Sequence, residues 1–216
     1  NAPDSASFDA SLQTDRRSGL LGPDVQLRSS RFQHAINGNR LKMGGSEGRV
    51  RFHDIAGGLT TWHNFASGPA GAAILEEGGF RVEFDWTAST TTSANWIEIS
   101  AGISNQAAGE PNPRANHSGT DFGMLFRDNG GVQYFKNGAG IADLPGAFTP
   151  TLNPRHVRVD FAFGSFADAS NVKANAWVDG TRVLTDYTFT WNGNAGANYF
   201  EFGSFTNVNY IDNFSM

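Results

Sequence analysis

Three pairs of residues in this chain have the types and the spacing to hold a sugar. In each pair an aromatic residue lies two positions from a polar one: Trp96 with Glu98, Tyr134 with Lys136, and Trp177 with Asn175. Side chains two positions apart in a β-strand lie on the same face, so each pair would present both groups to one ligand. Sugar rings have C–H faces that stack on aromatic rings, and hydroxyl groups that bond to carboxylates, amides and ammonium groups. Together with Trp62 and Arg127, these residues form the predicted ligand-binding set.

The same aromatic side chains have a structural alternative. Large aromatic residues in a two-sheet sandwich commonly fill the core between the sheets. A register shift of one residue would also turn every side chain of a strand to the other face. Sugar contact and core packing therefore both stay open for Trp96, Tyr134 and Trp177 at the level of sequence.

Composition excludes several other kinds of site. The chain has no cysteine, which excludes thiol catalysis, disulfides and cysteine-ligated zinc. A net charge of −5 argues against nucleic-acid binding and weakly against polyanionic glycans, although a local basic groove stays possible. The 5 histidines lack the short spacings of a transition-metal site. No apolar run reaches the roughly 20 residues that a membrane span needs.

The elements that must position these groups show most clearly between Arg155 and Tyr187. Apolar and polar residues alternate through residues 155–163, which is typical of a strand with one buried face. An Asp-Gly pair at residues 179–180 then suits a two-residue type I′ turn, in which both residues need positive φ. The same alternation recurs in residues 80–86 and 94–103. These patterns predict antiparallel strands joined by tight turns.

The chain as a whole predicts an all-β fold. Its 216 residues include 26 Gly and 18 Phe, and only 17% are charged, which favours many turns between aromatic-rich strands. About 12 to 14 short strands alternate with turn signals, among them Asn129-Gly130 and Asn137-Gly138 as further type I′ candidates. Nothing in the composition marks a boundary. We therefore expect one domain over residues 1–216, an antiparallel two-sheet jelly-roll β-sandwich.

Several segments follow one another in a characteristic order: FRVEFDW, ANWIEISAGIS, DFGMLFRDNGGVQYFKNG, RHVRVDF, VKANAWVDGTRV and the closing NYIDNFSM. This order resembles the concanavalin A-like lectin/glucanase superfamily, the laminin-G-like jelly roll. The resemblance covers residues 78–216 well and residues 1–77 loosely. It implies two large curved sheets, with a saccharide commonly held on the concave face and its rim loops.

The resemblance also implies a structural calcium, which in many members ties the last strand to the N-terminal region. Asp212, with Asp9 as a possible partner, stands where that resemblance would put the ligands. Calcium takes several oxygen ligands, many of them backbone carbonyls. The alternative is that Asp212 and Asn213 simply end a strand.

Glycosidases of the superfamily use a strand motif of the type Glu-x-Asp-x-x-Glu, which places three carboxylates on one face. Glu83-Phe84-Asp85 matches only the first half of that motif. The third carboxylate would fall on Ala88, and Glu98 stands alone in its own segment. A hydrolase of this type is therefore not expected.

Alginate lyases of the same fold offer a second enzymatic alternative. The segment 133–138, QYFKNG, resembles their Tyr-Phe-Lys-x-Gly segment. They also need an Arg-rich strand and a Gln-x-His strand, but residues 80–86 contain only Arg81, and Gln33 and His34 are adjacent. If the chain is a lyase, its catalytic residues would come from a small set: His34, His63, Tyr134 and Lys136.

The leading hypothesis is a non-catalytic module, extracellular or at the cell surface, that recognises a polysaccharide or oligosaccharide. The first residues, NAPDSAS, have the small polar character of a mature secreted chain or of the edge of a fragment. The alternatives are a polysaccharide-cleaving enzyme, more readily a lyase than a hydrolase, and a structural or adhesive surface protein that self-associates. Structural Ca²⁺ is the one candidate cofactor. A nucleic-acid partner and a membrane span are not expected.

Overall fold

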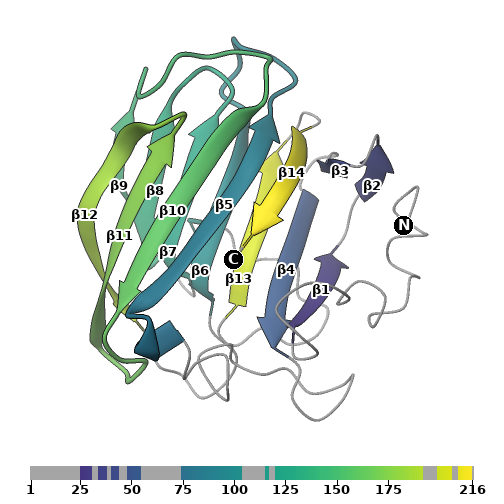
Figure 1. Ribbon diagram of the computed structural model, residues 1–216. Coiled ribbons are helices and arrows are strands. Elements are labelled where there is room, and N and C mark those ends of the chain that lie inside the picture. Colours follow the sequence, from purple (N-terminus) through teal and green to yellow (C-terminus); the bar gives the residue numbers. More distant parts are fainter. Residues whose placement is uncertain are drawn as a thin grey trace.

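The computed structural model describes residues 25–30, 34–37, 40–43, 48–54, 74–103, 115–116, 120–191, 199–205 and 209–215. Within these residues, fourteen strands form two antiparallel sheets of seven strands each. The first, called sheet A, has the order β1 (Val25–Ser30), β4 (Gly48–Asp54), β13 (Tyr199–Phe205), β6 (Trp96–Ile103), β7 (Thr120–Arg127), β8 (Val132–Lys136) and β9 (Ala139–Leu144). The second, called sheet B, has the order β12 (Thr181–Trp191), β11 (Ser170–Val178), β10 (Arg155–Phe163), β5 (Gly79–Thr87), β14 (Asn209–Ser215), β3 (Arg40–Met43) and β2 (His34–Asn37). Figure 1 shows the two sheets stacked face to face, which confirms the predicted β-sandwich.

Aromatic side chains join the two sheets across the core. Phe122 of β7 stacks on Phe189 of β12, with ring centroids 5.1 Å apart, and meets Phe161 of β10 edge-on at 5.8 Å. Phe84 of β5 meets Phe202 of β13 edge-on at 4.8 Å. Each such side chain contributes roughly 1.5–3 kcal/mol by leaving water. The inner faces are therefore filled, and any binding surface on the strands belongs to the outward faces.

The alternation expected in residues 155–163 is confirmed, because Val157, Val159, Phe161 and Phe163 of β10 are all buried. The predicted type I′ turns are confirmed at two of three positions: φ is 49° and 76° at Asp179-Gly180, and 48° and 75° at Asn137-Gly138. Asn129-Gly130 differs, because the positive φ of 88° belongs to Gly130 alone. Asn129 instead accepts a hydrogen bond from the Gly131 N–H through its side chain, at 3.2 Å.

A buried arginine fixes one end of the sandwich. The Arg155 guanidinium is inaccessible to water and donates to the carbonyls of Thr149 and Thr151, both at 3.0 Å. It also lies 4.7 Å from the ring of Phe148, whose N–H donates to the Gly130 carbonyl in the β7–β8 turn. Burial lowers the pKa of Arg155, against the opposing field of nearby carboxylates. This arginine therefore ties the 145–154 loop to the turn that joins two strands of sheet A.

Among the described residues, none belongs to a helix with the length and apolar character needed to cross a membrane.

Candidate functional site

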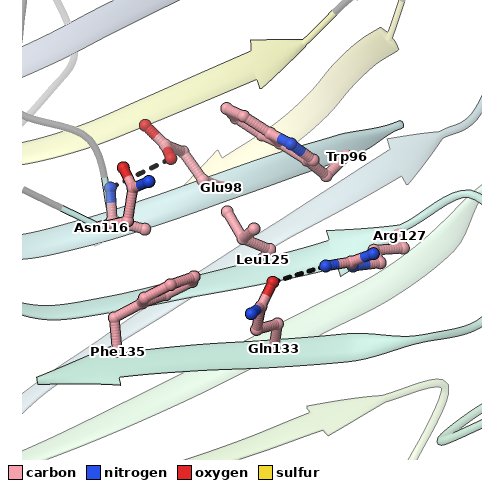
Figure 2. A pocket seen from close by; sticks show the side chains of 8 residues that line it. Trp96, Glu98, Asn116, Leu125, Arg127, Gln133 and Phe135 are labelled. Atoms are coloured by element: carbon pink, nitrogen blue, oxygen red, sulfur yellow. Dashed lines mark hydrogen bonds between the residues drawn. The ribbon is translucent and has the colours of Figure 1, made fainter. Parts of the chain in front are cut away.

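A pocket lies on the outward face of sheet A, across β6, β7 and β8 (Figure 2). Its volume of about 300 Å³ is at the lower end of the range for small-molecule sites. The pocket is lined by Trp96, Glu98, Ala115, Asn116, Leu125, Arg127, Gln133 and Phe135. The structure therefore brings together three residues of the predicted ligand-binding set.

Strand register explains why these side chains meet. Trp96 is the Cα partner of Arg127, and Glu98 is the Cα partner of Leu125, which in turn pairs with Gln133. Side chains of directly opposed residues lie within about 5.5 Å of each other at Cβ. Alternate residues of β6, such as Ile97 and Ile99, are buried in the core, so Trp96 and Glu98 take the outward face as the sequence predicts.

The apolar part of the pocket is formed by Trp96, Leu125 and Phe135. Leu125 and Phe135 are each 7% exposed and form a small cluster with Ala115, against which the half-buried Trp96 packs. This cluster lies outside the main core, on the outward side of sheet A. It can receive the C–H face of a sugar ring, because aromatic and aliphatic surfaces stack on such faces.

The polar part of the pocket combines a carboxylate, a guanidinium and two amides (Figure 2). Glu98 is fully buried, and its Oε2 accepts a hydrogen bond from the Ala115 N–H at 3.1 Å. The Arg127 Nη2 donates to the side-chain oxygen of Gln133 and lies 3.8 Å from the Asp143 carboxylate. Asn116, Arg127 and Gln133 keep exposed surface and can donate to and accept from several hydroxyls of one ligand, while the buried Glu98 holds residue 115 in place.

Two glycines make room for the Glu98 side chain and its partner. A Cβ on Gly203 would lie 2.4 Å from Glu98 Oε1, and a Cβ on Gly123 would lie 2.3 Å from the Ala115 Cα. Side-chain carbon at either position would displace these groups, because non-bonded carbon atoms prefer about 3.5–4.0 Å. The glycines therefore let Glu98 and residue 115 lie flat against sheet A.

Trp177 and Asn175 lie on the other side of the molecule, on the outward face of sheet B. The guanidinium carbons of Arg158 and Arg182 lie 4.5 and 5.4 Å from the centre of the Trp177 ring. These arginines are the register partners of Trp177 in β10 and β12, the strands that flank it on both sides. Asn175 Oδ1 accepts hydrogen bonds from Arg182 and from the Asp186 N–H. Both predicted residues are thus outward, but they do not join the pocket.

The same face of sheet B carries a shared carboxylate. Asp160 accepts hydrogen bonds from both Arg158 and Arg81, the latter at 2.8 Å. Burial alone would raise the pKa of Asp160, but the two guanidinium groups hold that pKa below its ordinary value. The bond to Asp160 in turn raises the pKa of Arg158. The arginines of this face are therefore neutralised locally.

Tyr134 and Lys136 lie on the side of β8 away from the pocket. The Tyr134 ring packs against the main core, 4.8 Å from the ring of Tyr187, and burial beside Tyr134 raises the pKa of Tyr187. Gln133 and Phe135 take the outward positions instead. The expectation that Tyr134 faces outward is therefore wrong, because its ring is drawn into the core while Phe135 covers the outer face. Ligand contact by Tyr134 and Lys136 stays a prediction.

The residues predicted for a lyase are not assembled in one place by the described strands. His34 begins β2, at one edge of sheet B, whereas Tyr134 and Lys136 belong to β8 of sheet A. His63 lies outside the described residues, as does Trp62 of the ligand-binding set.

The half-motif Glu83-Phe84-Asp85 is also remote from the pocket. Glu83 and Asp85 face outward from sheet B, where His156 approaches them with its ring nitrogens at 3.6 and 3.1 Å. Asp85 also accepts a hydrogen bond from the Asn213 side chain at 2.6 Å. The two carboxylates are thus held in a surface network of the second sheet.

A calcium site at Asp212 does not follow from the described part of the chain. Asp212 accepts a hydrogen bond from the Asn213 N–H at 2.9 Å, and its register partner Asp85 is engaged as above. Across the described residues, no group of three or more His, Asp or Glu side chains is arranged to hold a metal. Asp9 lies outside these residues, so calcium stays a prediction that rests on the resemblance.

Sequence reasoning missed five lining residues: Ala115, Asn116, Leu125, Gln133 and Phe135. A partial signal was present in β7, where Gly123 and Leu125 stand at outward positions at which an exposed strand would carry polar residues. Apolar residues on the outward side of a strand as well as on its inward side indicate a covered surface.

No protein-family model matches this chain, and no curated protein matches it. Solved structures of similar shape include the carbohydrate recognition domain of Emp46p in its potassium-bound form, which is 10% identical and has a TM-score of 0.51 over 94% of this chain and 90% of that one. The metal-free form of the same domain gives the same TM-score at 8% identity, over 94% and 89% of the two chains. The sialidase of Trypanosoma rangeli is 13% identical with a TM-score of 0.51, over 88% of this chain but only 27% of its own. At these identities the likeness is one of fold alone, and it agrees with the antiparallel two-sheet β-sandwich that the sequence predicts.

Proposed function

We propose that this protein is a carbohydrate-binding module that holds an oligosaccharide, or a segment of polysaccharide, in the pocket of sheet A. The observation that carries the proposal is the meeting of Trp96, Glu98 and Arg127 in one pocket with an apolar floor. The indole offers a stacking surface, the partly exposed Arg127 guanidinium offers strong hydrogen bonds to hydroxyls, and the buried Glu98 holds the pocket wall at residue 115. We further propose that residues 1–216 act as one domain, outside the cell or at its surface, where such polymers are met.

The contents of the pocket support binding over glycoside hydrolysis. Glu98 is the one carboxylate among the described residues that line it, whereas the common hydrolytic mechanism needs two. The carbohydrate recognition domain of Emp46p has a similar fold, which agrees with a binding role. Self-association stays a prediction, and the mass in solution at micromolar concentration would measure it.

The test is retention on a panel of immobilised neutral and acidic polysaccharides. We expect the wild-type protein to be retained on at least one polymer, and Trp96→Ala to weaken that binding about tenfold. The estimate follows from an aromatic contact of roughly 0.5–1.5 kcal/mol together with the area lost on truncation. Trp177→Ala is the matched control, since it removes an outward tryptophan from the opposite face, and we expect it to bind like the wild type.

Three results would count against the proposal. Lack of retention on every polymer, by a protein that is folded by circular dichroism, would refute it. Equal losses in Trp96→Ala and Trp177→Ala would place binding elsewhere. Release of unsaturated or reducing products from a bound polymer would establish the enzymatic alternative instead.

A further inference from the structure

We infer that the sugar held by sheet A is uncharged, and that Asp143 of β9 acts with Arg127 and Gln133 to bind its hydroxyl groups. This inference rests on the proposed function, and it gives that function a class of ligand and one further binding residue. Its basis is the arrangement of these three polar side chains at the β9 side of the pocket.

Strand register places Asp143 beside the pocket, although the lining residues of the pocket end at β8. Gln133 is the Cα partner of Leu125 on one side and of Asp143 on the other. Directly opposed residues share a face of the sheet, so Asp143 takes the outward face together with Gln133. The neighbouring pair, Tyr134 and Ala142, belongs to the core side. Asp143 therefore extends the polar side of the pocket to the edge of sheet A.

Arg127 reaches both of the other groups from β7. Its Nη2 donates to the side-chain oxygen of Gln133, as Figure 2 shows, and lies 3.8 Å from Asp143 Oδ2. Because a guanidinium can only donate, the amide oxygen of Gln133 must face it, and the NH₂ group of Gln133 stays available as a donor. The three side chains thus combine two donors with one acceptor.

The separation of Arg127 and Asp143 suits a hydroxyl group between them. An N–H···O bond spans about 2.7–3.2 Å, so at 3.8 Å the two charges attract each other without a direct hydrogen bond. The Asp143 carboxylate is 55% exposed, and none of the described residues donates a hydrogen bond to it. Polar groups at such a separation are commonly bridged by an O–H group. A sugar hydroxyl can form this bridge, because it accepts from the arginine and donates to the carboxylate.

The two charges at this end of the pocket cancel, which favours a ligand without charge. A carboxylate or sulfate could accept from Arg127 but has no proton to donate to Asp143, and the two anions would repel each other. An ammonium group could donate to Asp143 but could not accept from Arg127. Glu98 is buried beneath residue 115, so it adds no accessible charge. The net charge of −5 agrees with this reading, since it argues weakly against polyanionic glycans.

Strand β9 leaves room for a ligand to reach this group. The pairing of β8 with β9 shifts by one residue after Tyr134, which sets Gly140 opposite Phe135 in the position that Ile141 would otherwise take. A Cβ on Gly140 would lie 3.7 Å from the Phe135 ring and 3.9 Å from the Gln133 nitrogen. Glycine therefore leaves the edge of the ring and the amide uncovered on the β9 side. We expect a sugar ring over Phe135 with its hydroxyls directed toward β9.

Sheet B contains an ion pair of the same kind that its own chain closes. Arg182 Nη2 lies 3.5 Å from Asp186 Oδ1, and that same oxygen accepts a hydrogen bond from the Asn175 side chain at 3.3 Å. The Arg182 guanidinium also lies over the Trp177 ring, at 5.4 Å from its centre. This second pair therefore serves as a matched comparison for the pair at the pocket.

The test uses three derivatives of the neutral polysaccharide that the panel described above retains best. Hydroxyethyl, carboxymethyl and aminoethyl groups, at an equal and high degree of substitution, add similar bulk with no charge, negative charge or positive charge. We expect calorimetric titration at low salt to give the highest affinity for the hydroxyethyl polymer, by about fivefold over each charged one. This factor corresponds to one unscreened contact between like charges at about 4 Å in water.

Asp143→Asn removes the charge and keeps the shape and one acceptor. It should lower the affinity for the hydroxyethyl polymer about fivefold, because a bond to a charged group becomes a neutral one. It should also raise the affinity for the carboxymethyl polymer, since Arg127 is then no longer opposed, and Asp143→Glu should restore the wild-type preference. A merely structural role would not change the preference between polymers. Asp186→Asn is the matched control and should keep both affinity and preference.

Several outcomes would overturn the inference. Retention of acidic polysaccharides alone, or equal affinity for the three derivatives, would remove the uncharged ligand while Trp96→Ala still tests the proposed function. An unchanged preference in Asp143→Asn, with thermal unfolding showing an intact fold, would remove Asp143 from the site. Equal effects of Asp143→Asn and Asp186→Asn would show a general charge effect. Lack of retention on every polymer of the panel would overturn the proposed function itself.

Discussion

Replacing Gly203 by alanine tests whether the placement of Glu98 is what makes the pocket bind a sugar. Gly203 is the Cα partner of Glu98 across the β13–β6 pairing. A Cβ at this position would lie 2.4 Å from Oε1, 2.6 Å from Cγ and 2.8 Å from Cδ of Glu98. The carboxylate must then move by roughly 1 Å to restore ordinary contact distances.

The size of the effect follows from the hydrogen bonds that this movement breaks. Glu98 Oε2 accepts from the Ala115 N–H at 3.1 Å, so a displaced carboxylate no longer holds residues 115 and 116 in the wall of the pocket. A hydrogen bond to a charged group contributes roughly 1.5–3 kcal/mol, so affinity should fall about 10- to 150-fold if the ligand must restore this arrangement. Stability should fall by no more than about the same 1.5–3 kcal/mol, because the flexible end of Glu98 can yield and alanine suits a strand better than glycine.

The assay pairs calorimetric titration of the best-retained polysaccharide with thermal unfolding of the same sample. Gly164→Ala is the matched control, because a Cβ at Gly164 meets no atom within 4 Å. Wild-type affinity in Gly203→Ala would refute the idea that the position of Glu98 matters. A fall in Tm of more than about 10 °C would refute the idea that a flexible side chain alone gives way.

Three further predictions concern stability. Arg155→Met should lower Tm by about 4–8 °C, for a loss of about 2 kcal/mol. The control is Leu152→Met, which changes a 57% exposed residue in the loop that Arg155 holds and should leave Tm unchanged. Equal Tm values for the two variants in calorimetry would contradict this prediction. Asp160→Asn should lower the free energy of unfolding by about 1 kcal/mol at pH 7. Because the pKa of Asp160 is lowered in the folded state, this difference between wild type and variant should persist down to about pH 3.8, the ordinary pKa, and shrink below it. A difference that grows in acid would be evidence against the ion pair. If Asp9 and Asp212 bind calcium, added Ca²⁺ should raise Tm by a margin that Asp212→Asn abolishes, and an unchanged wild-type Tm would end that prediction.

The strands with one buried face were predictable because burial of one face requires apolar and polar residues to alternate along the sequence. In β5 and β10 every second side chain is apolar and lies in the core, as with Val82 and Phe84 or Val157 and Val159. The turn at Asp179-Gly180 was predictable for a similar reason, since two successive positive φ angles demand such residues. These are local constraints, and a single sequence carries them.

The orientation of β8 was not predictable, because its residues satisfy either face. Tyr134 and Phe135 are adjacent aromatics in a five-residue strand, and the irregular pairing with β9 falls between them. The Asn129-Gly130 turn was mistaken because Asn129 bonds through its side chain instead of adopting positive φ. Both outcomes depend on contacts that short-range patterns do not contain.

An outward tryptophan becomes a candidate for sugar binding through the residues that neighbouring strands place beside it. Trp96 and Trp177 each alternate with buried residues of their own strand, so the pattern within each strand predicts an outward side chain for both. The strands that flank Trp177 place Arg158 and Arg182 over its ring, which occupies the stacking surface. Beside Trp96, β7 places Arg127, which donates to Gln133, and Leu125, and a pocket remains between them. Lateral register, which joins residues far apart in the chain, therefore decides which ring can meet a ligand, and a sugar bound by Trp177 in place of Trp96 would show that this reasoning is wrong.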